Sequence, residues 1–192
     1  MAQYSRPDAD MVDGSFTPSA GSDLYAVLDD NSDTDYITSA SAADDTCQVS
    51  AGTVTDPGSS SGHVLRARLK RSKAVSQYNA TVTLKQGSTT IATLSVTTVD
   101  STVTTYSYTL SGAEADAITD YSDLNFTLAA DYVAGSGCNL LCYWIELETP
   151  DANPQASESE AVGVAEATSA QVGIVTAASD AVGVGEGPGG VV

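Results

Sequence analysis

Two adjoining segments near the middle of the chain alternate apolar and polar residues with a period of two. In residues 63–71, Leu and Ala alternate with Arg and Lys, and in residues 74–85, apolar residues alternate with Gln, Asn and Thr. Successive side chains of a strand point to opposite faces, so each segment predicts a half-buried β-strand. Similar alternation recurs in four later segments, residues 89–99, 102–111, 124–132 and 140–148. Long strands joined by polar turns favour antiparallel sheets.

Shorter apolar segments add three strands to this prediction, at Leu24–Leu28, Tyr36–Thr38 and Cys47–Val49. We also expect one short helix, residues 112–119, because Ser111 followed by Glu114 forms a capping-box pattern. About eight or nine strands with one helical connection predict an all-β fold, an antiparallel two-sheet jelly-roll sandwich. An immunoglobulin-like sandwich is the alternative, and the lack of a Cys-Trp-Cys spacing disfavours it.

Composition divides the chain into three parts. Residues 1–22 are polar and contain several Pro and Gly, which predicts an extended N-terminal arm. Residues 23–150 hold the predicted strands and form the jelly-roll β-sandwich domain. From residue 151 to residue 192 the composition changes to Ala, Val, Gly, Ser and Glu, and a Val-Gly-Val unit recurs. We expect this C-terminal arm to order on a neighbouring subunit by strand addition, and a disordered linker is the alternative.

Positive charge is concentrated in one short stretch of the sequence. The 192 residues carry 25 acids and seven Lys or Arg, for a net charge of −18, and only one of these cations lies outside residues 66–85. Such a strip suits docking onto an acidic neighbour, so we predict a subunit or capsid contact. Five of its residues are candidates for this contact, Arg66, Arg68, Lys70, Arg71 and Lys73. Acids of the same subunit that neutralise the strip are the alternative.

Charge and motifs exclude several function classes. A net charge of −18 argues against a nucleic-acid partner, because phosphate contacts require clustered cations. We expect no membrane contact and no export, since no apolar stretch is long enough to span a bilayer and the N-terminus lacks a signal-peptide core. We also predict no enzymatic activity. The one histidine, His63, borders a Gly/Ser loop where a solvated side chain is expected, and Glu146 and Glu148 are interpreted as a hydrated strand edge.

An acidic turn is the one pattern that suggests a metal. Asp29, Asn31 and Asp33, with Asp35 beside them, match the first ligands of a calcium loop. The glycine and the bidentate glutamate that complete that motif are absent. A structural Ca or Mg ion is therefore the only cofactor that we consider, and an acidic turn that arises by chance in an Asp-rich chain is the alternative.

The three cysteines form no recognisable metal or disulfide motif. Cys138 and Cys142 lie four residues apart, without the second pair or the placed histidine that would complete a zinc site. Cys142 falls within a predicted strand and is interpreted as a small core residue. A bridge between Cys47 and Cys138 is compatible with the sequence, so the disulfide state stays open at this point.

Several segments between Leu24 and Pro150 form a pattern that extends over about two-thirds of the chain, namely residues 24–26, 33–37, 57–59, 108–111, 115–118, 120–124 and 143–150. In this pattern the chain resembles jelly-roll virion proteins of tailed viruses. The resemblance implies a capsid decoration, cement or turret protein that is often trimeric and binds outside a capsid. An acid-rich surface stays hydrated when salt screens charge, which adds a saline or halophilic habitat as a hypothesis.

From these observations we expect a capsid decoration protein, a structural virion protein that binds the outer surface of a tailed-virus head through oligomerisation and arm exchange. Its partners would be itself, as a homotrimer, and the major capsid protein or other virion proteins. The alternative is a glycan- or receptor-binding module of a tail fibre or turret. Trp144 is the candidate residue for stacking on a sugar. The direction of its side chain distinguishes the two functions, because a tryptophan in the core offers no platform for a sugar ring.

Overall fold

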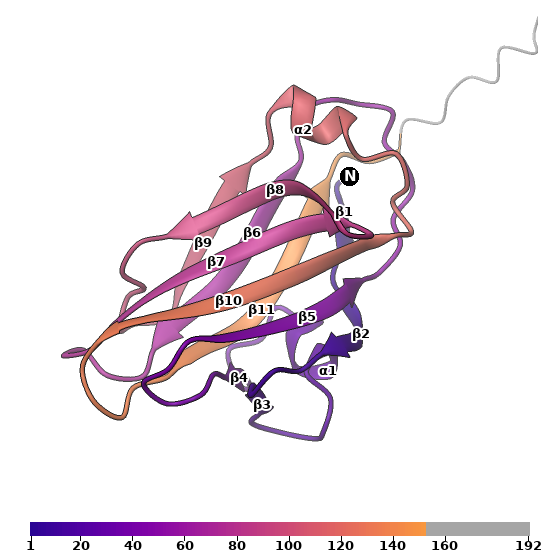
Figure 1. The fold of residues 1–192 in the computed structure, drawn as a ribbon. Helices are drawn as coiled ribbons and strands as arrows, with labels where there is room; N and C mark the ends of the chain where they lie inside the picture. Colours follow the sequence, from indigo (N-terminus) through magenta and orange to yellow (C-terminus); the bar gives the residue numbers. More distant parts are fainter. Residues whose placement is uncertain (153–192) are drawn as a thin grey trace, which may run out of the picture. The chain divides into compact units, whose positions relative to one another are not determined.

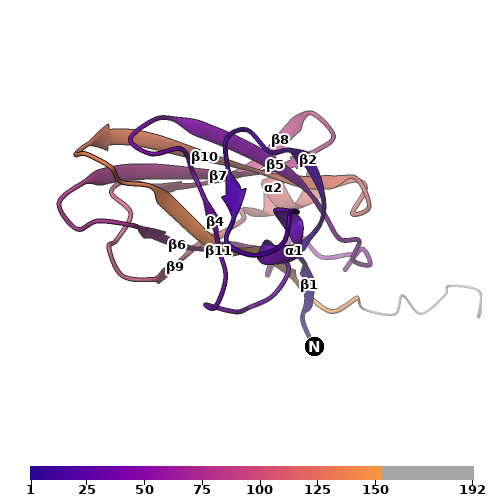
Figure 2. The ribbon, with the colours of Figure 1, turned by 90° about the horizontal axis from the view of Figure 1, so that it is seen from below.

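The computed structural model describes residues 1–152 as two antiparallel β-sheets packed face to face (Figure 1, Figure 2). Sheet A has the strand order β3-β4-β11-β6-β9, with β1 also paired to β11, and sheet B has the order β2-β5-β10-β7-β8. The strands of sheet A are β1 (Gln3–Ser5), β3 (Thr17–Pro18), β4 (Ile37–Thr38), β6 (Val64–Arg71), β9 (Thr104–Thr109) and β11 (Leu140–Thr149). Those of sheet B are β2 (Pro7–Val12), β5 (Asp45–Ala51), β7 (Gln77–Gln86), β8 (Thr89–Val96) and β10 (Leu124–Ala134). This architecture confirms the predicted all-β jelly-roll sandwich, and no helix within residues 1–152 is long and apolar enough to cross a membrane.

The core lies between the sheets and is built from the inward positions that the alternation predicted. Leu65, Ala67 and Leu69 of β6 are fully buried, and so are Tyr78 of β7 and Phe126 of β10. Full burial of a large apolar side chain contributes about 1.5–3 kcal/mol. The Tyr78 hydroxyl lies within hydrogen-bonding distance of three carbonyl oxygens, those of Ala40, Ala43 and Cys138. Its buried polar tip is thereby satisfied, and it ties two connections to the core.

Strand β11 departs from the predicted alternation. Its register against β6 shifts between Cys142 and Trp144, which is a β-bulge with Tyr143 as the extra residue. An extra residue reverses the face on which every later side chain lies. The main core therefore receives four residues of β11, Leu140, Cys142, Ile145 and Leu147. The uninterrupted alternation predicted for residues 140–148 would place Leu141 and Tyr143 on the same face as Ile145 and Leu147. It is wrong at this point, because Leu141 and Tyr143 form a second apolar cluster with Trp144.

Residues 24–28 were predicted as a strand, but they form helix α1 (Tyr25–Leu28). Leu24, Val27 and Leu28 are buried, and their three- and four-residue spacing places them on one side of a helical turn. The Asp10 carboxylate accepts hydrogen bonds from the backbone N–H groups of Leu24 and Tyr25, at 2.9 and 2.7 Å. It satisfies donors that a helix start leaves free, from a position that no local pattern reveals.

The N-terminal segment is extended, as expected, but it pairs within the chain. Strand β1 pairs with β11, β2 with β5 and β3 with β4. Residues 1–22 therefore add strands to the chain's own sheets, and β2 and β3 form an end of sheet B and of sheet A, respectively. Of the predicted C-terminal arm, residues 151–192, all but the first two residues lie outside the described residues.

The short helix predicted at residues 112–119 is confirmed as α2 (Gly112–Asp116), which ends three residues earlier than predicted. Ser111 caps it, because the side-chain oxygen accepts the Glu114 N–H while the Glu114 carboxylate accepts the Ser111 N–H at 2.7 Å. The same carboxylate accepts a hydrogen bond from the Tyr108 hydroxyl at 3.0 Å, which fastens α2 to β9. These contacts hold the first turn of α2, whose last residue is Asp116.

Replacement of Ser111 tests whether this cap positions the helix. We expect Ser111→Ala to lower the free energy of unfolding by about 1 kcal/mol, the usual cost of a lost N-cap. Urea unfolding followed by far-ultraviolet circular dichroism measures the change. Ser122→Ala, at an exposed turn, serves as the control for hydroxyl removal. An unchanged unfolding midpoint for Ser111→Ala would show that α2 is held by its packing alone.

Candidate ligand-binding site

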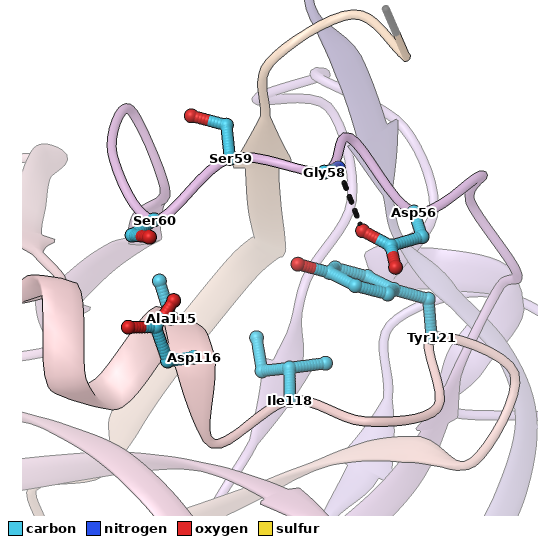
Figure 3. Close-up of a pocket in the computed structure, with 8 residues that line it drawn as sticks. All are labelled: Asp56, Gly58, Ser59, Ser60, Ala115, Asp116, Ile118 and Tyr121. Carbon is cyan, nitrogen blue, oxygen red and sulfur yellow. Dashed lines mark hydrogen bonds between the residues drawn. The ribbon is translucent and has the colours of Figure 1, made fainter. Parts of the chain in front are cut away.

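A polar pocket of about 210 Å³ opens at one end of the sandwich, where two connections pass between the sheets (Figure 3). One connection runs from β5 in sheet B to β6 in sheet A, and the other runs from β9 in sheet A through α2 to β10 in sheet B. Eight residues line the pocket, Asp56, Gly58, Ser59, Ser60, Ala115, Asp116, Ile118 and Tyr121. The pocket therefore joins two segments that are distant in the sequence, since Asp56 and Asp116 lie about sixty residues apart.

Local interactions hold each wall of the pocket in place. The Asp56 carboxylate accepts the Gly58 N–H at 2.7 Å, an Asx turn that shapes the first wall. Gly58 has φ +58°, a backbone conformation that suits glycine. On the opposite wall, Ile118 and Tyr121 are each only 6% exposed and belong to the main core. Both walls are thus anchored by the fold, while Asp56 is exposed to solvent.

His63 lies behind the pocket, fully buried, so the prediction of a solvated loop histidine is wrong. Its Nε2 atom lies 2.7 Å from the Tyr121 hydroxyl, while no residue of the described part satisfies its Nδ1 atom. Position 63 shares its parity with Leu65 and Ala67, and this signal in the sequence places its side chain on the inner face of β6. Neighbouring glycines and serines concealed that signal.

The electrostatic environment of the pocket is negative. Burial raises the pKa of Tyr121 to about 12, and the carboxylates of Asp56 and Asp116 act in the same direction. Burial also lowers the pKa of His63, while the Ser61 carbonyl and the same two carboxylates oppose this shift. Both rings are therefore neutral at pH 7 and lie in the field of two ionised acids. The pocket lining contains no Lys or Arg.

Arg66, which we predicted as a docking residue, is an internal partner of β11. Its guanidinium lies 3.3 Å from the Glu146 carboxylate and also pairs with Glu148. Arg6 approaches the same Glu146 carboxylate at 3.1 Å. The Glu146 side chain is only 4% exposed, and a buried carboxylate needs such partners. The prediction of a hydrated Glu146 and Glu148 edge is therefore wrong for Glu146, and the strip is neutralised within the chain at this point.

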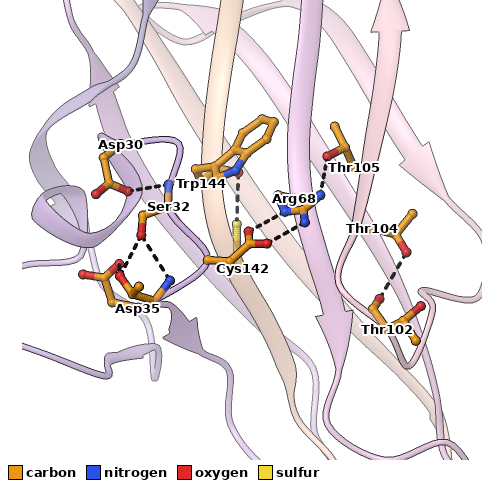
Figure 4. A network of polar contacts seen from close by, with 11 residues as sticks. Asp30, Ser32, Asp35, Arg68, Thr102, Thr104, Thr105, Cys142 and Trp144 are labelled. Carbon is orange, nitrogen blue, oxygen red and sulfur yellow. Dashed lines mark hydrogen bonds and ion pairs between the residues drawn. The ribbon is translucent and has the colours of Figure 1, made fainter.

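Most of the other predicted contact residues also have partners within the chain. Arg68 forms an ion pair with Asp33, with its Nη2 atom 2.6 Å from a carboxylate oxygen, and donates to Thr105 (Figure 4). Backbone carbonyls accept hydrogen bonds from Arg71 and Lys73, namely those of Val99, Ala74 and Ser136. Lys70 is half-buried and forms no ion pair within residues 1–152. The structure thus supplies, from distant segments, the partners that the local sequence lacks.

The acidic turn does not gather the predicted metal ligands. Asp33 directs both carboxylate oxygens at Arg68. Within the described range, no group of three or more His, Cys, Asp or Glu residues is placed so that it could hold a metal ion. Asp29, Asp33 and Asp35 therefore do not form such a group. Nearby, the Asp30 carboxylate accepts the Ser32 N–H at 2.9 Å (Figure 4). Of the four predicted ligands, Asp29, Asn31, Asp33 and Asp35, it is Asp33 that anchors the turn to Arg68 of β6.

Trp144 offers no platform for a sugar. It is 7% exposed and packs with Leu141 and Tyr143 in the second cluster, against the partly buried Tyr36. The rings of Tyr36 and Tyr143 lie 5.4 Å apart between centroids in a tilted arrangement. The prediction of an exposed ring for sugar stacking is wrong, because the structure covers Trp144. Neither the bulge nor the segment that covers the ring could be recognised in the sequence.

All three cysteines are buried and free in the structure. Cys142 belongs to the main core, as predicted, and burial raises the pKa of its thiol far above the ordinary value. Burial also raises the pKa of the Cys47 thiol, with help from nearby aspartates. Thiols in this state are weak nucleophiles, so these residues act as small core side chains.

No family model matches the chain, and no curated protein matches it. Among solved structures, a xylan-binding module of family CBM15 is 9% identical, with a TM-score of 0.45 over 80% of this chain and 100% of that chain. The C-terminal CBM6 module of a laminarinase from Zobellia galactanivorans is 15% identical, with a TM-score of 0.43 over 78% and 100%. A CBM61 module in complex with β-1,4-galactotriose is 8% identical, with a TM-score of 0.43 over 74% and 88%. Overlap and identity at this level assign neither a family nor a ligand to this chain.

Replacement of Arg66 separates an internal ion pair from a subunit contact. We expect Arg66→Gln to lower the free energy of unfolding by about 1–3 kcal/mol, because the buried Glu146 loses a charged partner. Lys70→Gln is the matched control, on the same face of the same strand, and should change stability far less. Urea unfolding gives the stability, and light scattering gives the oligomeric state. Loss of an oligomer in Arg66→Gln without loss of stability would restore the subunit contact.

The ion pair between Arg68 and Asp33 makes the cover over Trp144 sensitive to acid. Its hydrogen bond to Arg68 lowers the pKa of Asp33, so the stabilisation is present above the ordinary carboxyl range and is lost as pH falls through the lowered pKa. Trp144 is the only tryptophan, so its fluorescence reports the cover directly. We expect a red shift and stronger quenching by acrylamide in Asp33→Asn at pH 7, and in the wild type only in strong acid. Asp29→Asn, in the same turn, should behave as wild type, and an unshifted Asp33→Asn spectrum would contradict the ion pair's role.

Proposed function

We propose that this chain is a non-catalytic saccharide-binding module whose end pocket holds a single sugar unit. The observation that carries the proposal is the combination of two carboxylates and serine hydroxyls with an aliphatic wall in one small pocket. Sugars present the same combination, since hydroxyl groups surround a ring with apolar C–H faces. A few placed polar groups on an apolar surface give a binding site its orientation and specificity.

Each type of group in the pocket has a partner on such a ligand. The carboxylates of Asp56 and Asp116 can accept hydroxyl protons, and the Ser60 hydroxyl can donate or accept. Ile118 and the ring of Tyr121 offer apolar surface to C–H groups (Figure 3). At about 210 Å³ the pocket is smaller than the roughly 300 Å³ at which sites for drug-sized ligands begin. It therefore suits one ring, at the end of a chain or as a branch, rather than several.

The pocket lacks the arrangement that hydrolysis by a serine nucleophile would need. His63 is the only histidine of the chain, and its Nε2 atom is occupied by the Tyr121 hydroxyl. A general base must lie within hydrogen-bonding reach of the nucleophile that it activates. His63 is therefore not available as a general base for a serine of the pocket.

Capsid decoration, with a homotrimer at the virion surface and the major capsid protein as partner, stays a prediction that rests on the sequence resemblance. The basic strip no longer supports it, because Arg66 and Arg68 are used inside the chain. A saccharide-binding module of a virion, at a turret or tail fibre, is compatible with both the resemblance and the pocket. We therefore place the binding function first and leave its location as part of the proposal.

Binding to a panel of mono- and oligosaccharides, measured by isothermal titration calorimetry, tests this function. We expect saturable binding with one site per chain, and a loss of at least about tenfold in affinity for Asp116→Asn, since a hydrogen bond to a charged group contributes about 1.5–3 kcal/mol. Asp131→Asn is the control, because Asp131 is exposed on β10 and does not line the pocket.

Two outcomes would contradict the proposal. One is the absence of binding to every saccharide of the panel at millimolar concentration. The other is equal affinity of Asp116→Asn and the wild type, which would place any binding outside the pocket. Circular dichroism of each variant verifies that the fold is intact in either case.

A further inference from the structure

The hydrogen-bonding groups of the pocket are mostly acceptors. Ionised Asp56 and Asp116 accept hydrogen bonds and donate none. The Gly58 N–H is already used by Asp56, and the Ser59 hydroxyl interacts with Ser61 in the same loop. Few donors of the pocket are therefore free to meet an incoming ligand, and a ligand that brings its own donors has the advantage.

The pair of His63 and Tyr121 adds one more acceptor. A neutral imidazole has one N–H and one lone pair, and burial keeps His63 neutral at pH 7 by lowering its pKa. His63 Nε2 lies 2.7 Å from the Tyr121 hydroxyl, which uses one of the hydrogen-bonding positions of that hydroxyl. Whether the hydroxyl donates to Nε2 or accepts from it, the phenol oxygen keeps a lone pair for another donor. This oxygen points toward the pocket in Figure 3.

The charge of the pocket points the same way. Asp56 and Asp116 act on the ionisation of both Tyr121 and His63, in each case favouring the more positive form. No Lys or Arg in the lining offsets these acids. A neutral ligand would cover two carboxylates without a counter-charge, and desolvation of an unpaired charge is costly. A ligand with a positive charge would remove that cost.

We infer that the pocket selects a saccharide unit that carries a free ammonium group, so that its ligand class is a cationic amino sugar. This inference rests on the proposed saccharide-binding function and names the ligand of the same site. An ammonium group has three donors and no acceptor, which matches the two carboxylates and the phenol oxygen. The ring of the sugar then lies against Ile118 and Ala115, and its hydroxyls reach the serines of the opposite wall.

A divalent cation suits this site less well than an ammonium group. Calcium takes six to eight oxygen ligands, and magnesium requires a near-octahedral set. The lining offers two carboxylates, and no group of three His, Cys, Asp or Glu residues that could hold a metal is found within residues 1–152. Hydrogen bonds from a single ammonium group need only the three acceptors that are present.

A matched ligand pair tests the inference. A glucosamine trisaccharide and its fully N-acetylated counterpart share ring, linkage and length, and they differ in the amine. The titration is carried out at about pH 6, where an amine of ordinary pKa is protonated. Isothermal titration calorimetry with the full chain should give at least tenfold tighter binding of the amine form, and added sodium chloride should weaken only that form.

Variants show whether the selectivity arises in this pocket. Asp116→Asn should bring the affinities for the two trisaccharides close together, and Tyr121→Phe should weaken the amine form while leaving the acetylated form nearly unchanged. Asp131→Asn should retain the full difference. Circular dichroism and the unfolding midpoint identify any variant that has lost its fold, and Asp116→Asn, at an exposed position, preserves the test if Tyr121→Phe is unstable.

Several results would overturn the inference. Equal affinities for the two trisaccharides would refute it and leave the saccharide-binding function intact, whereas a blank panel of sugars would refute that function itself. Binding of the simple amine cadaverine as tightly as the amino sugar would show an ammonium site without a saccharide partner. Binding of calcium that is lost in Asp116→Asn would assign the pocket to a metal instead.

Discussion

Strand β11 is buried on both faces, and its buried side chains require partners from much of the rest of the structure. Its inner face packs in the core, it pairs with β6 along one edge and with β4 and β1 along the other, and its outer face carries Glu146 and Trp144. A buried carboxylate requires cations, and a large aromatic ring on a sheet surface requires a cover. Arg6 and Arg66 meet the first requirement, and the segment around Tyr36 meets the second. The concentration of cations on β6 therefore has a structural origin, since β6 is the neighbour of β11.

The period-two alternation was sufficient to predict the sandwich, because burial of one face of a strand leaves its signature in the order of residues. Leu65, Ala67 and Leu69 show it on β6, and the capping box of Ser111 and Glu114 is equally local. Features that depend on distant partners left no such signature. The helix at residues 25–28 needs Asp10, and the bulge at Tyr143 appears only when β11 is aligned with β6.

The candidate site was harder to predict than the fold for the same physical reason. Asp56 and Asp116 belong to different connections, and only closure of the two sheets brings them to one pocket. A chain with 25 acids also gives no reason to single out two of them. His63 could have been placed by its parity with Leu65, yet its pairing with Tyr121 depends on a contact across 58 positions of sequence. For Trp144 the strand was predicted correctly, but the exposure of its side chain was not. The residues that cover the ring lie far away in the sequence.

The charge balance of the chain links its structure to the ligand class. Arg6, Arg66 and Arg68 are paired with acids inside the described part of the chain. With all seven Lys and Arg counted, the 25 acids still leave a net charge of −18. A body of this charge attracts cations from solution and repels anions, and a concave site concentrates the field. Exposed acids elsewhere on the surface can draw a cationic ligand in, but they lack the apolar wall and the phenol oxygen that hold it. The pocket at the end of the sandwich combines the negative field with the apolar wall and the phenol oxygen. Cations in general are attracted to the surface, and the pocket selects cationic amino sugars among them.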